Sequence, residues 1–146
     1  IESRLNSAET VGYPDIELPD VNAQKVKLSD VDAKVTMIFF WSAADATQKM
    51  FNLDFLKSIY DDYHKKGFEI YQVSLDPDKA TWARVVKEQK LPWISVCDYA
   101  GERSLLLRSY NVRKLPSNFL VDREGRIIAK DIYSDALRRK LSSLLN

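Results

Sequence analysis

The sequence predicts an α/β fold in a single domain, and three observations support this prediction. Strand-like and helix-like segments alternate along the chain, as in proteins whose helices pack against a sheet. No Pro/Gly/Ser-rich linker and no internal repeat interrupts the alternation. The length of 146 residues and the hydrophobic content of 45% suit one domain with its own core. We therefore expect one domain over residues 1–146.

The first half of the chain contains the most distinct strand and helix signals. Val26–Leu28 fits a short strand, and the apolar run Val35–Trp41 predicts a central strand buried on both faces. Asp45 is a candidate N-cap for the following helix, and Gly67 is its stop signal. We expect this helix to bury a stripe of apolar residues spaced by three and four: Met50, Leu53, Leu56, Tyr60 and Tyr63.

The second half of the chain continues the same alternation. Phe68–Leu75 predicts another buried strand, and Asp76-Pro77-Asp78 opens a helix over about Lys79–Gln89. That helix should bury Trp82, Val85 and Val86. We further expect a strand at Trp93–Val96, a short helix at Ser104–Tyr110, a hairpin of Asn118–Asp122 with Ile127–Lys130, and a closing helix at Ser134–Leu145.

Charge and composition exclude several classes of partner. The 22 Lys and Arg residues nearly balance the 21 Asp and Glu residues, and the charges are interspersed, so nucleic acid is not expected as a partner. No apolar run reaches the roughly 20 residues that cross a bilayer. One Cys and one His are too few for a Cys/His zinc site, and no metal or cofactor is expected. The composition leaves the oligomeric state open.

Two stretches resemble a known family, the TlpA-like thiol-disulfide oxidoreductases of the thioredoxin superfamily, which overlap with AhpC/TSA-like proteins. The opening PDIELPD of Pro14–Asp20, followed by VKLSD at Val26–Asp30, is similar to the family's entry segment. YNVRKLPSNFLVDREGRI at Tyr110–Ile127 resembles its cis-proline loop and the hairpin after it. The resemblance implies a thioredoxin-like three-layer α/β/α sandwich with a central mixed β-sheet. It also implies a place in the bacterial periplasm or cell envelope.

The family's reactive site is altered in this chain. In the family, a Phe-Trp strand end leads into Trp-Cys-x-x-Cys, whereas here Phe40–Lys49 reads FWSAADATQK. Asp45 and Gln48 therefore take the two cysteine positions, and Ala44 replaces the preceding aromatic residue. Disulfide exchange needs an attacking thiolate at this place. The resemblance thus implies a redox-inactive domain with a degenerate CxxC motif.

The resemblance nevertheless predicts that a binding groove is retained. Its expected ligand-binding residues come from the strand end, the helix start and the cis-proline loop: Trp41, Ala44, Asp45, Gln48, Leu115 and Pro116. In the family, the backbone of the residue before the proline pairs with an extended peptide. A simpler interpretation makes Asp45 only an N-cap, Gln48 an exposed first-turn residue and Pro116 a requirement of the turn.

Three functional hypotheses remain open at this point. The first is a redox-inactive binding or structural module of the cell envelope, with no catalytic residue. A second is an oxidoreductase or peroxidase that works through Cys97, although a lone cysteine at a strand end is more typical of a small buried residue. The third is a domain that only supports a neighbouring one. Because the chain begins at Ile1, we expect it to be the C-terminal part of a longer precursor.

Overall fold

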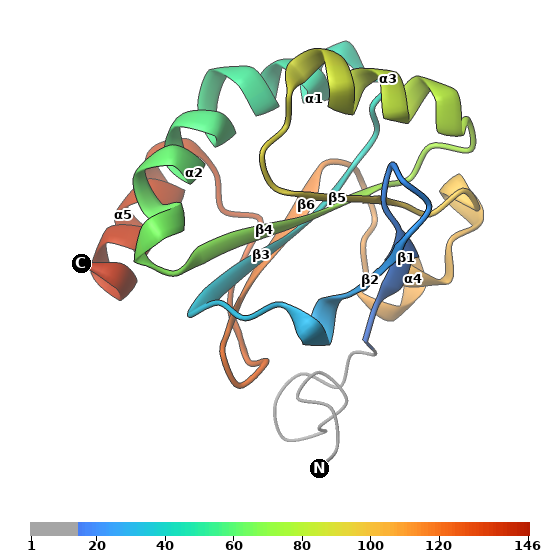
Figure 1. The fold of residues 1–146 in the computed structure, drawn as a ribbon. Coiled ribbons are helices and arrows are strands. Elements are labelled where there is room, and N and C mark those ends of the chain that lie inside the picture. Colours follow the sequence, from blue (N-terminus) through green and yellow to red (C-terminus); the bar gives the residue numbers. More distant parts are fainter. Residues whose placement is uncertain (1–14) are drawn as a thin grey trace.

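A five-stranded sheet forms the centre of the protein, seen in a computed structural model that describes residues 15–146 (Figure 1). Pro14 of the entry segment lies outside the described residues. In chain order the elements are β1 (Glu17–Pro19), β2 (Lys25–Lys27), β3 (Val35–Trp41), α1 (Ala46–Phe51), α2 (Lys57–Tyr63), β4 (Phe68–Ser74), α3 (Lys79–Gln89), β5 (Ile94–Cys97), α4 (Leu105–Ser109), β6 (Ser117–Asp122), β7 (Ile127–Lys130) and α5 (Ser134–Leu145).

The central sheet is mixed, as expected. Its strand order is β5-β4-β3-β6-β7. β3 runs parallel to β4, and β4 runs parallel to β5. On its other side β3 pairs antiparallel with β6, and β6 pairs antiparallel with β7. The C-terminal ends of β3, β4 and β5 therefore lie at the same edge of the sheet as the start of β6.

Helices and a small ribbon cover the two faces of this sheet. One hydrophobic cluster joins the sheet to α2, α3 and α5, which arch over the same face in Figure 1. A second cluster lies on the opposite face, under α4 and the antiparallel β1–β2 ribbon. The result is the predicted three-layer sandwich. Within the described residues, no helix is both long and apolar enough to cross a membrane.

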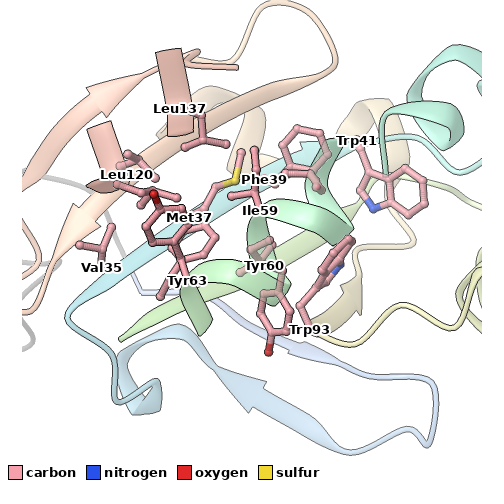
Figure 2. Packing of buried hydrophobic residues seen from close by; sticks show 14 of the residues in the cluster. Val35, Met37, Phe39, Trp41, Ile59, Tyr60, Tyr63, Trp93, Leu120 and Leu137 are labelled. Carbon is pink, nitrogen blue, oxygen red and sulfur yellow. The ribbon is translucent and has the colours of Figure 1, made fainter. Parts of the chain in front are cut away.

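β3 is the core strand, since all seven of its residues are buried. Alternate side chains of a strand point to opposite faces. Figure 2 shows Met37 and Phe39 pointing toward Ile59 of α2 and Leu137 of α5. The residues between them, such as Ile38, contribute to the other cluster. This burial on both faces explains why the strand reads as an uninterrupted apolar run.

Several predicted elements match the structure. The strand Val35–Trp41 and the helices Lys79–Gln89 and Ser134–Leu145 have the predicted bounds. The predicted strand at Val26–Leu28 is shifted by one residue. Leu28 instead begins a 3-10 turn, and its backbone N–H donates to the carbonyl of Ile16 at 2.8 Å.

The predicted apolar stripe of the first helix is wrong in its first half. Met50 and Leu53 are 50% and 43% exposed, whereas Asn52 is fully buried. The backbone from Asn52 to Leu56 is π-helical, which places an extra residue in the turn and changes the helix phase. In the second half, Leu56, Tyr60 and Tyr63 are buried as predicted.

A chain of buried amides takes the place of the missing apolar contacts. Asn52 donates to Gln89 at 3.0 Å and accepts from Gln72 at 2.9 Å. Gln72 in turn accepts from the indole of Trp93 at 2.9 Å, and Gln89 donates to the carbonyl of Lys49. Each of these groups is satisfied, so a polar network links α1 and the π-helical segment to β4 and α3.

Candidate functional site

Two loops leave the same edge of the sheet and form the candidate site. Trp41 ends β3, and the next residues lead into α1. Phe40 pairs with Ser117 in the β3–β6 register. Trp41 follows Phe40 and Pro116 precedes Ser117, so both lie just beyond this last pair. The register therefore brings the start of α1 to the same end of the sheet as the loop before β6.

Asp45 acts as the N-cap of α1. Its carboxylate accepts from the backbone N–H of Gln48 at 3.1 Å, and its backbone is extended, as the cap position requires. The side chain is exposed. The capping interaction alone accounts for an aspartate at this position, and contributes about 1 kcal/mol to stability.

Gln48 is buried rather than exposed, contrary to expectation. Only 6% of the residue is accessible. Its side-chain Oε1 accepts from the backbone N–H of Ser42 at 2.7 Å. The glutamine thus ties the first turn of α1 back to the loop that precedes it. Nothing in the local sequence pattern indicates this contact, because it depends on how the loop folds over the helix.

Asp76 belongs to the site, although the sequence alone did not assign it there. It is only 3% exposed, and it lies just beyond β4, which ends at Ser74. Its carboxylate accepts from Ser42 Oγ at 2.9 Å and from the backbone N–H groups of Ala43 at 2.7 Å and Ala44 at 3.3 Å. The hydroxyl of Ser74 also donates to it. The sequence alone places Asp76 only at the opening of the next helix, after the buried strand predicted at Phe68–Leu75.

Cys97 lies deeper, beneath Asp76. The residue is fully buried, and Sγ is 3.4 Å from the Asp76 carbonyl oxygen and 3.6 Å from Ser74 Oγ. Burial raises the pKa of its thiol to about 11, although the hydrogen bond with Ser74 acts in the opposite direction. The thiol is therefore protonated near neutral pH. The fold brings Cys97 close to the helix-start loop, from which it is far apart in sequence.

The remaining predicted site residues differ in accessibility. Trp41 is fully buried, and its indole Nε1 has no hydrogen-bond partner among the described residues. Ala44 is exposed, and Leu115 and Pro116 are half-buried. Trp41 and Gln48 therefore support the site from below, while the other four predicted residues lie at its surface.

The loop before β6 contains a cis peptide bond between Leu115 and Pro116. The hydroxyl of Tyr133 donates to the Pro116 carbonyl at 3.1 Å and so links the loop to the start of α5. Beside the loop is a hollow of about 330 Å³, lined by Lys114, Leu115, Pro116, Asp131 and Tyr133. This hollow gives a ligand access to the loop.

Comparisons with known proteins identify the family to which these features belong. Residues 12–130 match the family model described as "AhpC/TSA family". The chain is 26% identical over 133 residues to the thiol-disulfide oxidoreductase ResA of Bacillus thuringiensis subsp. konkukian, covering 90% of this chain and 73% of the relative.

Solved structures give the same result. The C-terminal domain of a putative thiol-disulfide oxidoreductase from Bacteroides thetaiotaomicron is similar with a TM-score of 0.82 and 32% identity, over 91% of this chain and 93% of that one. An uncharacterized thioredoxin-like protein from Bacteroides vulgatus is 36% identical with a TM-score of 0.79, over 91% and 86% of the two chains. The chain therefore belongs to the AhpC/TSA family, has the thioredoxin-like fold and is a relative of thiol-disulfide oxidoreductases.

Proposed function

We propose that this domain is a redox-inactive member of its family that binds an extended peptide beside the cis-proline loop. The proposal rests on the two positions where the family has its cysteines, since both residues found there have structural roles. Asp45 caps α1, and Gln48 holds the backbone of Ser42. Neither side chain can attack a disulfide or release a thiolate, which are the two steps of exchange.

Cys97 does not offer a substitute for the missing pair. A thiol must be accessible and ionised to attack a disulfide or a peroxide. The Cys97 thiol is fully buried, and its pKa is raised to about 11. Both properties argue against an oxidoreductase or peroxidase that works through this residue.

Peptide binding is supported by the surface that the loop presents. Residue 115 precedes the cis-proline and is half-buried, next to an open hollow. An extended peptide can pair with the loop through main-chain hydrogen bonds, and this pairing needs no thiol. The loop is also fixed where it meets β6, because the Tyr133 hydroxyl donates to the carbonyl of Pro116, the residue before that strand. A fixed loop loses less entropy when it binds.

The location and wider context of the domain are part of the proposal. We place it in the bacterial periplasm or cell envelope, because the TlpA-like proteins that it resembles work there. We also regard residues 1–146 as one domain at the C-terminal end of a longer protein. A similar solved structure from Bacteroides thetaiotaomicron is described as a C-terminal domain, which supports that assignment.

The test is an insulin-reduction assay in dithiothreitol. We expect the native protein to be inactive and Asp45→Cys/Gln48→Cys to gain activity, because the helix start and the cis-proline loop are already in place. Asp45→Ser/Gln48→Ser is the matched control. Serine is close in size to cysteine but carries no sulfur, so this variant should stay inactive. If the native protein reduces insulin, the proposal is wrong and Cys97→Ala identifies the source of the activity.

A further inference from the structure

Two adjoining hollows flank the cis-proline loop. The first is lined by Lys114, Leu115, Pro116, Asp131 and Tyr133. The second is lined by Asn111, Arg113, Lys114, Ser117, Lys130 and Asp131. Because both contain Lys114 and Asp131, they form one continuous surface, which we call the loop groove. A peptide that follows the loop backbone would lie along it.

The loop groove is positively charged in an otherwise balanced chain. Its cations are Arg113, Lys114 and Lys130, and all three are exposed. No ion pair in the described part of the chain involves any of them. Lys130 Nζ lies 5.3 Å from the centre of the Phe119 ring, a contact that supplies no opposite formal charge. The net charge of the whole chain is only +1, so this group of cations is a local feature.

The single carboxylate in the loop groove is already engaged by the protein. Asp131 Oδ1 accepts from Ser117 Oγ at 2.8 Å and from the backbone N–H of Asn118 at 3.1 Å. These bonds fix the carboxylate on β6 rather than against the neighbouring cations. Asp45, the exposed acidic residue of the helix start, lines neither hollow. The groove therefore offers more positive charge than its own residues neutralise.

We propose that the peptide recognised in the loop groove is acidic, with Asp or Glu side chains that pair with Arg113, Lys114 and Lys130. This inference rests on the proposed function and adds the substrate class. The half-buried Leu115, Pro116 and Tyr133 provide an apolar wall for the peptide's other side chains. Backbone pairing would supply affinity, while the charges select the sequence and speed association.

The contribution of each cation should be modest and sensitive to salt. Ion pairs between exposed side chains are weak individually, and a Debye length of about 8 Å at physiological ionic strength screens them. With three cations acting together, we expect an acidic peptide to bind about tenfold more tightly than its neutral counterpart. Raising the NaCl concentration should remove most of that difference.

Isothermal titration with three pools of nine-residue peptides tests the proposal. The pools share alternating Val, Thr and Tyr residues and differ in the intervening positions, which are Asp/Glu, Asn/Gln or Lys/Arg. The native domain should prefer the acidic pool, and Arg113→Glu/Lys114→Glu should lose that preference. The matched control is Arg84→Glu/Lys87→Glu, which changes the net charge equally at exposed positions of α3 and should retain it.

The outcomes separate this inference from the proposed function. Equal binding of the acidic and neutral pools, or a preference for the basic pool, overturns the charge selection but leaves peptide binding in place. Equal loss of preference in both double variants shows a net-charge effect and also overturns the inference. If no pool binds, peptide recognition itself is wrong. Circular dichroism of each variant verifies that the fold is retained.

Discussion

At the scale of single residues, the carboxylate of Asp76 organises the loop that precedes α1. It receives hydrogen bonds from three consecutive residues of that loop, Ser42, Ala43 and Ala44, and from Ser74 of β4. Such a buried carboxylate is tolerated because its lone pairs are used by donors. The loop conformation is thereby set by a residue more than thirty positions away in sequence.

Replacing Asp76 should therefore destabilise the domain. Asp76→Ala leaves the buried N–H of Ala43 without an acceptor, and we expect it to lower the free energy of unfolding by about 3 kcal/mol. Asp76→Asn retains one acceptor oxygen and should cost about half as much. Urea unfolding measures both, with the exposed Asp61→Ala as control. An Asp76→Ala variant within about 0.5 kcal/mol of the native protein would show that the loop relaxes onto other acceptors.

At the scale of secondary-structure elements, predictions succeeded where burial follows hydrophobic periodicity. Val35–Trp41 is apolar without interruption, and α3 and α5 begin and end at the predicted residues. Asp45 was recognised as a cap because its role depends only on the adjacent turn. Burial of Gln48 could not be predicted, because an amide gives no periodic hydrophobic signal.

The first helix supplies the clearest test of this difference. The predicted apolar stripe would require an apolar residue at position 50 and would tolerate leucine at position 52, which lies outside the stripe. We expect the reverse. Asn52→Leu leaves Gln72 and Gln89 with unpaired amide groups and should cost about 2 to 3 kcal/mol. Met50→Gln, at a position that is 50% exposed, should stay within about 0.5 kcal/mol of the native protein.

Chemical denaturation of the two variants measures this contrast. A more stable Asn52→Leu variant would mean that apolar packing outweighs the amide chain, as replacement of buried polar networks sometimes shows. Position 52 would then be an ordinary core position of the observed helix, which needs no polar partner.

At the scale of the whole molecule, resemblance supplied the three-layer sandwich with a mixed sheet and the general place of the site, which local patterns alone did not. The parts that it could not supply are contacts between elements that are distant in sequence. Ser42 is fixed both by Gln48 and by Asp76, and Cys97 lies against Asp76. These contacts depend on how the loops and strand ends fold over one another, so only three-dimensional packing reveals them. The same holds for the charge of the loop groove.

Buried thiol and phenol groups make the stability of the protein depend on pH. Besides Cys97, burial raises the pKa of Tyr60, Tyr71 and Tyr133, in the last case to about 12. In the unfolded chain these groups lose their protons at lower pH than in the folded one. The unfolded state then binds fewer protons, so the free energy of unfolding must fall as pH rises. Stability should be unaffected by these groups below about pH 9 and decline above it.

Cys97 can be separated from the tyrosines because its ordinary pKa is lower, 9.0 against 10.0 for tyrosine. Between pH 9 and pH 10 we expect the native protein to lose up to about 1.4 kcal/mol of stability that Cys97→Ala does not lose. Urea unfolding at half-unit pH intervals gives the two slopes, and comparing slopes removes the constant cost of the cavity. Parallel slopes would mean that Cys97 ionises as readily in the folded protein as in the unfolded chain. An ionised thiol next to the helix-start loop would restore the hypothesis of redox chemistry through Cys97.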